Sequence, residues 1–234
     1  MASDGIIVHH LEDSRSQRVL WLLEELEVPY TIKFYKRDEN RRAPPELLEV
    51  HPLGKSPVIT DGSLTLAESG AIVEYLISKY GKEKFGVNDE SSEAWVNNRF
   101  FTHYAEGSVQ PLLVSRLIYR RVPSKVPIFI RPIVKRVFSK IDGLINAPDL
   151  EKHGKLIEAR LVEVESKGGW LAGTGEDRPT SADFLMVLTL QIFLNRAPEY
   201  AGPKTREYVK KVQARPAYKK GLEKGGPFDY EYKE

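Results

Sequence analysis

The side chains best placed for chemistry in this sequence flank a short proline turn. The stretch HPLGKSPVI occupies residues 51–59, and Glu68-Ser69 follows nine residues later. The Ser56-Pro57 bond is a candidate for the cis isomer, because proline alone brings the cis form close in energy to the trans form. In that geometry the backbone amide and carbonyl of Ser56 would face outward and pair with another extended backbone. The stretch therefore predicts a site for a peptide-like ligand.

Charged groups near this turn match the ends of such a ligand. Lys55 offers a cation to one carboxylate, and Glu68 offers an acceptor to an ammonium group. The N–H groups of the helix that opens at Ser69 would bind a second carboxylate. A small peptide with two carboxylates and one amine fits these contacts, and glutathione is such a peptide. A plain surface hairpin followed by a capped helix is the alternative, and these residues alone leave both interpretations open.

Composition excludes several kinds of chemistry. Cysteine is absent from the 234 residues, so disulfides, thiolate metal sites and cysteine nucleophiles are excluded and a reactive sulfur must arrive with the substrate. A formal net charge of +2 gives no indication of nucleic-acid binding. The adjacent His9 and His10 would point to opposite faces of a strand, and no further side chains complete a ligand set. We therefore predict no metal site.

The amino terminus and the apolar runs indicate where in the cell the protein is located. The amino terminus lacks the basic and apolar regions of a signal peptide. The longest near-continuous apolar run, residues 184–194, has 11 residues, which is too few to span a bilayer. We expect a soluble, cytoplasmic protein.

The first 81 residues alternate between strand and helix patterns. Apolar residues at helical spacing predict a helix over 16–26, and Pro29 lies just beyond its end. The Asp61-Gly62 pair between two short β-branched segments predicts a two-residue hairpin turn. The full prediction is strands at 6–8, 30–35, 57–60 and 63–66, with helices at 16–26, 44–48 and 68–80. This βαβ-α-ββα order is that of an α/β thioredoxin-like domain, which we predict over 1–81.

The remaining chain has a different pattern. The polar residues 82–92 predict a linker. From Glu93 onward the periodicity is helical and interrupted by prolines, which predicts an all-α domain over 93–234. Thr180 and Asp183, just before the apolar run, predict a capping box that starts a buried helix, although Glu or Gln is usual at the third position.

Several segments resemble the cytosolic glutathione transferases of the serine type, over essentially the whole chain. The segments are HHLEDSRSQRVLWLLEEL at 9–26, YKRD at 35–38, RAPPEL at 42–47, EGSVQP at 106–111 and RPAY at 215–218. The second, third and fourth are similar, more narrowly, to the fungal Gtt branch and its bacterial relatives. Together they are specific, whereas one Ser-Pro or one Glu-Ser pair would not be.

The resemblance implies residue roles. Ser14 matches the catalytic serine of the family, and Ser16 is the alternative because it also lies at the helix start. The implied glutathione-binding residues are Arg42, Lys55, Ser56, Pro57, Glu68 and Ser69. Within that set, the two basic residues would contact the glycine carboxylate, Ser56 would pair with the cysteinyl unit ahead of the cis proline, and Glu68 with Ser69 would hold the γ-glutamyl end.

The implied chemistry is activation of a thiol. A free thiol with a pKa near ~8.5 is only a few per cent thiolate at pH 7, and lowering that pKa by about two units requires roughly 2.7 kcal/mol. A hydroxyl bond from Ser14 supplies roughly 1.5–3 kcal/mol, and the positive helix end adds about 0.3–1 kcal/mol. A purely structural alternative exists, because residues 14–17 read Ser-x-x-Gln and Ser14 could cap the helix with Gln17 reciprocating.

The second domain is less informative. Tyr104 and Ser108 are candidates for the electrophile site, with packing as the alternative. Residues 107–141 contain eight basic and no acidic residues, interspersed with apolar ones. This pattern predicts either an ordinary solvated helix face or, through the basic 116–140 segment, weak association with an anionic membrane.

Two functions remain open at this level. One is an enzyme that transfers glutathione, as cosubstrate and without other cofactor, to hydrophobic electrophiles for detoxification, with a possible glutathione-dependent peroxidase activity. The other is a non-catalytic glutathione-binding, ligand-binding or regulatory module on the same fold. The resemblance also implies a homodimer.

Overall fold

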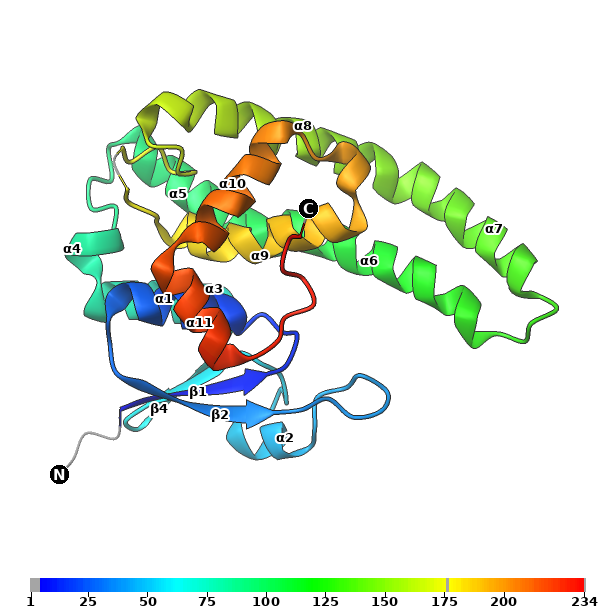
Figure 1. Ribbon diagram of the computed structural model, residues 1–234, viewed down its shortest axis with the longest axis horizontal. Coiled ribbons are helices and arrows are strands. Elements are labelled where there is room, and N and C mark those ends of the chain that lie inside the picture. The colour runs from blue at the N-terminus through cyan, green and yellow to red at the C-terminus, as the bar shows by residue number, and fades with distance from the viewer. Residues whose placement is uncertain (1–4, 176, 234) are drawn as a thin grey trace.

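The fold was analysed in a computed structural model, which describes residues 5–175 and 177–233. Figure 1 shows a small sheet with its helices at one end of the molecule, joined to a larger helical part from which a pair of helices projects. In the described residues every strand lies before residue 68, and everything from Glu93 onward is helix or loop. The predicted combination of a thioredoxin-like α/β domain with an all-helical part is therefore confirmed.

The sheet contains four strands in the order β2-β1-β3-β4. The strands are β1 (Ile6–Leu11), β2 (Tyr30–Tyr35), β3 (Val58–Asp61) and β4 (Leu64–Ala67). β1 pairs in parallel with β2, with Ile6 opposite Tyr30, while β3 runs antiparallel to both β1 and β4. The parallel pair requires a crossover helix, and α1 (Gln17–Leu26) supplies it.

The hairpin turn lies one residue later than predicted. Asp61 pairs with Leu64, so the two turn residues are Gly62 and Ser63 rather than Asp61 and Gly62. Gly62 has φ +60° and Ser63 does not have a positive φ. A single glycine at the first turn position is what a type II′ turn needs, which explains the shift.

Helices cover both faces of this sheet. α1 and α3 (Ser69–Tyr80) lie between the sheet and the helical part, and α2 (Glu46–Val50) lies on the opposite face (Figure 1). Leu47 of α2 is fully buried against Leu11 and Tyr35. The predicted linker 82–92 contains a short helix, α4 (Lys82–Phe85), whose Phe85 is buried against Phe184. The domain limits themselves stay a prediction.

The helical part is built around one buried helix. Its main helices are α5 (Glu93–Tyr104), α6 (Gln110–Arg121), α7 (Arg131–Ile141), α8 (Ala147–Val164), α9 (Ser181–Arg196), α10 (Pro203–Ala214) and α11 (Pro216–Gly225). Short turns of other helix types join them at η1 (Ala105–Val109), η2 (Val122–Lys125), η3 (Asp142–Asn146), η4 (Glu165–Lys167) and η5 (Pro198–Tyr200). Every residue of α9 except Asn195 is buried. The predicted capping box is present, with Thr180 and Asp183 bonding each other reciprocally.

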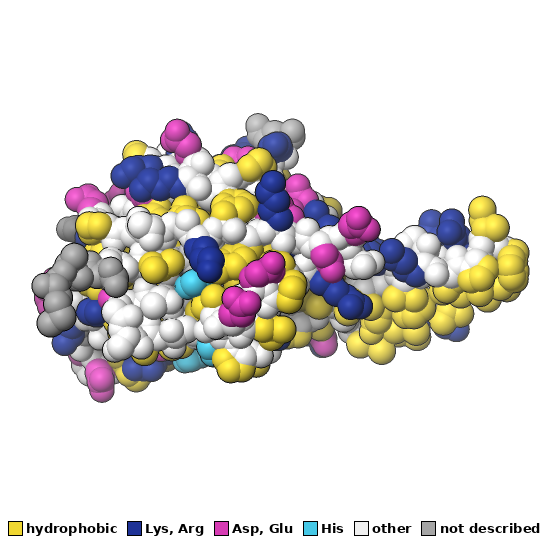
Figure 2. Space-filling view, turned by 90° about the horizontal axis from the view of Figure 1, so that it is seen from below, with side chains coloured by type: hydrophobic (Ala, Val, Ile, Leu, Met, Phe, Trp, Pro, Cys, Tyr) yellow, Lys and Arg dark blue, Asp and Glu magenta, His cyan; other side chains and the backbone are white. Residues whose placement is uncertain are grey.

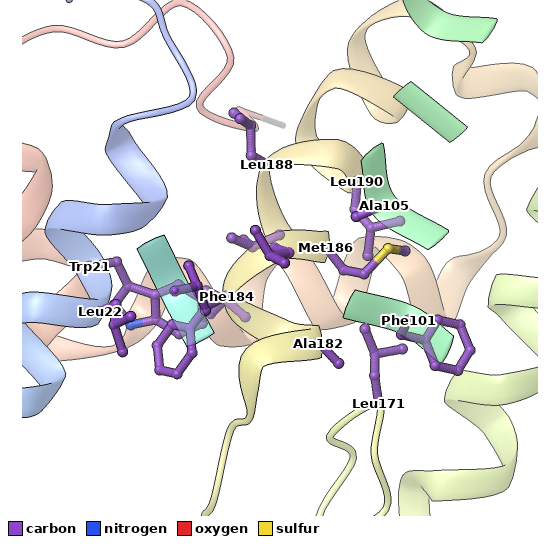
Figure 3. Close-up of a cluster of buried hydrophobic side chains, with 14 of the residues drawn as sticks. Trp21, Leu22, Phe101, Ala105, Leu171, Ala182, Phe184, Met186, Leu188 and Leu190 are labelled. Carbon is purple, nitrogen blue, oxygen red and sulfur yellow. The ribbon is translucent and has the colours of Figure 1, made fainter. Parts of the chain in front are cut away.

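One hydrophobic core spans both parts of the molecule. Figure 3 shows Trp21 and Leu22 of α1 next to Phe184 of α9, while Phe101 and Ala105 lie on the other side of the same helix. The ring centroids of Trp21 and Phe184 are 4.4 Å apart. Trp21 is thus a core residue, as its position in the apolar belt predicts.

In the described part of the chain, no helix is long and apolar enough to cross a membrane. Over the same residues, no group of three or more His, Cys, Asp or Glu side chains could hold a metal ion.

Candidate functional site

Five of the six predicted glutathione residues line one pocket of about 260 Å³, the first pocket. They come from two segments, the 55–57 turn and the start of α3. The lining residues are Arg15, Leu53, Lys55, Ser56, Pro57, Ala67, Glu68, Ser69 and Glu106. The Ser56-Pro57 bond is cis. Ser56 anchors the turn to β1, because its hydroxyl donates to the His9 carbonyl at 2.8 Å and accepts from the Leu11 amide at 3.1 Å.

The start of α3 has an unusual backbone conformation. Glu68 has φ +73° and ψ +119°, a region that side-chain-bearing residues rarely adopt and that costs about 1–3 kcal/mol. Glu68 lines the first pocket, and no side chain caps the N-terminus of α3 among the described residues. Helix N–H groups free of a side-chain cap bind anions well. A carboxylate acceptor and a helix N-terminus therefore meet at one wall of the pocket.

Arg42 lies outside this arrangement. Its side chain is exposed and does not line the first pocket, and its backbone N–H donates to Asp38 Oδ1 at 2.7 Å. Lys55 is exposed too but lines the pocket. Of the two predicted basic contacts, the geometry therefore brings only Lys55 to the site.

Ser14 lines a neighbouring pocket of about 170 Å³, the second pocket, whereas Ser16 lines neither. Arg15 and Ser56 line both pockets, so the two pockets adjoin at these residues. Ser14 is 9% exposed and Ser16 is 0% exposed. Of these two serines, only Ser14 can touch a ligand that extends from the first pocket into the second.

A chain of hydrogen bonds connects Ser14 to a buried histidine. Ser14 Oγ lies 2.7 Å from Ser16 Oγ, which lies 2.7 Å from His10 Nδ1. The Gly225 backbone raises the pKa of His10, as an acceptor that faces a ring N–H does, so the ring nitrogen on that side is the donor. The ring is neutral, since burial lowers the pKa of His10 to about 4. With Nδ1 facing Ser16, the proton lies on Nε2 and Nδ1 is an acceptor.

This tautomer fixes the direction of the other bonds. Ser16 must donate its only hydroxyl proton to His10, so its oxygen accepts from Ser14. The Ser14 oxygen in turn accepts from the Ser16 backbone N–H at 3.2 Å. The Ser14 proton is therefore donated to Ser16 Oγ.

The capping alternative for Ser14 is not realised. The N-cap residue of α1 is Ser16, and the Ser14 oxygen accepts from the Ser16 amide rather than from the Gln17 amide that a capping box would use. The reciprocal half is missing, because Gln17 Nε2 is buried and has no hydrogen-bond partner among the described residues. Ser14 thus supports the helix start and lines the pocket with the same hydroxyl.

Charges gather where the two pockets meet. Arg15 Nε lies 3.0 Å from Glu106 Oε2, and Arg18 Nη1 lies 2.8 Å from Glu106 Oε1. Arg18 is 1% exposed, and burial lowers its pKa to about 10 while Glu106 holds it up, so it stays charged at pH 7. Glu106 therefore forms ion pairs with both arginines and is also a lining residue of the first pocket.

The second pocket combines apolar walls with basic and polar groups. Its walls are Asp13, Ser14, Arg15, Arg37, Ser56, Gln110, Val114, Leu117, Leu188, Ile192, Arg196 and Tyr230. Arg196 Nη2 donates to the Tyr230 hydroxyl at 2.8 Å. The Asp229 amide donates to Asp13 Oδ1 at 2.8 Å, so the carboxy-terminal segment is tied across the loop before α1. The carboxy-terminal segment thus contributes Tyr230 to the second pocket.

Tyr104 and Ser108, the predicted electrophile residues, line neither pocket. Tyr104 is 7% exposed, its hydroxyl bonds His153 Nδ1, and its ring stacks on Phe100. That bond directs Tyr104 toward α8 and away from Ser14. The geometry favours the packing alternative for Tyr104, and it gives no support to Ser108.

Sequence reasoning missed several residues of the site. His10 had been considered only as a metal ligand, and Arg15, Glu106 and Gln110 were not singled out. Glu106 and Gln110 lie in the EGSVQP segment that carries part of the resemblance. That segment was the available signal for both residues.

The neutral state of His10 predicts a pH effect on stability. The folded pKa of His10 is about 4 and the unfolded value is near 6.5, so only the unfolded chain gains a proton between these values. Stability is therefore full above about pH 6.5 and falls as the pH drops toward 4. For His10 we expect a loss of about 2 kcal/mol at pH 5 relative to pH 7. In urea titrations, the free energy of unfolding of His10→Asn should fall between pH 7 and pH 5 by about 2 kcal/mol less than that of the wild type. Equal losses in both proteins would contradict the neutral state of His10.

Comparison with known proteins gives a consistent result. Residues 3–78 match the family model described as "Glutathione S-transferase, N-terminal domain". The chain is 33% identical over 229 residues to glutathione S-transferase 1 of Saccharomyces cerevisiae, which covers 94% of each chain. It is 40% identical over 136 residues to glutathione S-transferase 3 of Schizosaccharomyces pombe, a match that covers 58% of this chain and 55% of that relative.

A solved structure supports the same relationship. The chain superimposes on a glutathione S-transferase from Actinobacillus pleuropneumoniae with a TM-score of 0.71 and 30% identity, covering 96% of this chain and 95% of that one. The agreement therefore extends across both the α/β part and the helical part.

Proposed function

The chain belongs to the glutathione S-transferase family, and from that premise we propose that it activates the thiol of glutathione as a thiolate for attack on hydrophobic electrophiles. The observation that carries the proposal is that the two pockets adjoin at Arg15 and Ser56, with Ser14 Oγ 3.4 Å from Ser56 Oγ. A tripeptide held in the first pocket can extend its sulfur toward Ser14, which lies in the second.

The charges of the first pocket support the choice of glutathione. Lys55 faces the glycine carboxylate, the N-terminus of α3 receives the γ-glutamyl carboxylate, and Glu68 accepts from the ammonium group. Glu106 offers a second acceptor at the same pocket. The strained backbone of Glu68 is consistent with a ligand-binding role, because strain of this kind clusters at functional sites.

Two features stabilise the thiolate, namely the Ser14 hydroxyl and the positive end of α1. The Ser14 hydroxyl turns from Ser16 Oγ to the sulfur while its oxygen keeps the bond from the Ser16 amide. The positive end of α1, which begins at Gln17, adds about 0.3–1 kcal/mol. No general base is required, since the product is a bound anion and its proton leaves to water.

Ultraviolet difference spectroscopy of bound glutathione tests this proposal. We expect thiolate absorbance to appear at a pH well below the ~8.5 of a free thiol. An unshifted thiol pKa, together with measurable binding of glutathione, would favour the non-catalytic module instead. A panel of aryl halides and isothiocyanates would then identify the electrophile class.

The two predicted basic contacts can be separated by a matched pair of variants. Lys55→Met should raise the KM for glutathione about five- to tenfold with little change in kcat, because it removes one partly solvated charge-assisted bond worth about 1–1.4 kcal/mol. Arg42→Met, which removes the same charge outside the pocket, should change KM less than twofold. Initial rates at varied glutathione concentration measure both, and equal effects would contradict the placement of Lys55.

Three finer proposals follow from the family and the pockets. A bound thiolate can also attack an oxygen of a hydroperoxide, which breaks the O–O bond and gives an alcohol and glutathione sulfenic acid; a second glutathione then forms the disulfide and water. Hydroperoxides should therefore be tested beside the electrophiles. We propose a detoxifying enzyme of the cytosol, where the thiol pool is kept reduced.

We also propose a homodimer, in which the exposed Val96 and Phe100 of α5 lie at a subunit contact. Sedimentation of the wild type and of Phe100→Glu tests the dimer.

A further inference from the structure

The projecting pair of helices seen in Figure 1 has features that the proposed transfer reaction does not use. This arm comprises residues 110–141, with α6, η2, a tip loop at 126–130 and α7. Its helices pack on each other through Tyr119 and Phe138, whose ring centroids are 5.6 Å apart. No residue of α7 is buried, so the arm extends away from the core. Its base lines the second pocket through Val114 and Leu117, and its tip is the far end of the molecule.

The charge of the arm has one sign. It contains eight basic and no acidic residues. Arg116 is buried at the base, where Asp142 and Glu199 bind it. The other seven cations are exposed and are Arg120, Arg121, Lys125, Arg131, Lys135, Arg136 and Lys140. The outer arm therefore presents a concentrated positive surface.

Apolar side chains are exposed among these cations. Ile128 and Phe129, at the tip, are 75% and 78% exposed. Ile118 on α6 and Ile133 and Val137 on α7 are also exposed. Figure 2 shows a band of hydrophobic side chains, in yellow, along the projecting arm, with dark-blue basic side chains beside it. Exposed contiguous apolar surface of this kind marks an interaction site.

The tip is held open rather than collapsed onto the arm. Arg131 Nε donates to the Val126 carbonyl at 3.0 Å and its Nη2 donates to the Ser124 carbonyl at 3.3 Å. The Ile130 amide donates to the Pro127 carbonyl at 3.1 Å. The loop thus satisfies backbone groups internally while Ile128 and Phe129 point outward, as a loop that enters an apolar medium requires.

We propose that the tip loop and its flanking cations dock on an anionic membrane surface. Ile128 and Phe129 enter the boundary between headgroups and acyl chains. Lys125 and Arg131 then contact the lipid phosphates. Charge complementarity decides between occupants: a second copy docking arm on arm would place seven exposed cations against seven more, whereas anionic lipid neutralises them. This is peripheral attachment, which leaves the second pocket at the base of the arm outside the bilayer.

Vesicle sedimentation of the full-length protein tests the proposal. We expect binding at low salt to vesicles of equal parts phosphatidylcholine and phosphatidylglycerol, loss of binding at high salt, and weak binding to phosphatidylcholine alone. Phe129→Asp combined with Ile128→Asp should weaken binding at least tenfold, and Lys125→Glu combined with Lys135→Glu should do the same. Lys152→Glu combined with Lys155→Glu on α8 changes the net charge equally outside the arm and should bind as the wild type does.

Each other outcome overturns the proposal. No binding of the wild type at low salt, or equal weakening by the α8 control, would exclude the arm as the membrane contact. If the tip variants convert an oligomer into monomers in sedimentation velocity while vesicle binding is unchanged, a second copy occupies the tip. Transferase activity toward a water-soluble aryl halide and the urea midpoint should stay at wild-type values in all variants, which separates this proposal from the proposed function.

Discussion

Ser14→Ala is expected to raise the pKa of the bound thiol by about one unit. In the protonated state Ser14 donates to Ser16 Oγ, and in the thiolate state it donates to sulfur. The net stabilisation of the thiolate by Ser14 is therefore the difference between a charge-assisted hydrogen bond of about 1.5–3 kcal/mol and a neutral hydrogen bond of about 0.5–1.5 kcal/mol. At a pH below the thiol pKa, kcat/KM should fall about tenfold, since 1.36 kcal/mol corresponds to a factor of ten. Difference spectra and initial rates measure both quantities.

Ser16→Ala is the matched control and should act in the opposite direction. It removes the oxygen that accepts the Ser14 proton, so the hydroxyl donates to sulfur without giving up another bond. The bound-thiol pKa should then stay the same or fall by up to about one unit. A rise equal to that of Ser14→Ala would mean that the two serines and His10 act as one unit, and the direction of the bonds derived above would be wrong.

The sequence predicts the first pocket well because its residues lie in short local patterns. The Ser56-Pro57 turn and the Glu68-Ser69 helix start are recognisable from residue types and spacing, and five of six predicted residues line one pocket. Arg42 is the exception. Only the resemblance points to Arg42, and its exposed side chain, in the loop before α2, does not line that pocket.

The second pocket and the relay behind Ser14 depend on contacts between distant segments. Gln110, Leu188 and Tyr230 come from α6, α9 and the carboxy-terminal segment, and no local pattern connects them. His10 bonds Ser16 six residues later and the Gly225 backbone at the end of α11. The pairing with α11 exists only once the core has formed, so the sequence alone gives a histidine on a strand without a partner.

A second large effect is expected at Asp183, on stability. Its fully buried carboxylate accepts from the Leu171 amide at 2.9 Å, the Tyr208 hydroxyl at 2.8 Å, and the Thr180 amide and hydroxyl at 2.8 and 3.1 Å. Asp183→Asn replaces one accepting oxygen with a donor, which leaves two buried donors without a partner. At about 1–3 kcal/mol for each, the free energy of unfolding should drop by roughly 2–6 kcal/mol in urea titrations. Asp149→Asn, the same change on the exposed face of α8, should stay within about 0.5 kcal/mol of the wild type.

The position of Asp183 also predicts how the protein unfolds. The helix that it starts packs Phe184 against Trp21 of α1 and carries Leu188 and Ile192 to the second pocket. Because one core joins the α/β part to the helical part through α9, loosening this helix start should destabilise both parts together. Far-ultraviolet circular dichroism and tryptophan fluorescence should therefore report coincident transitions in the wild type and in Asp183→Asn. If the variant loses helix signal in a separate first step while the environment of Trp21 is retained, α9 is not the element that couples the two parts.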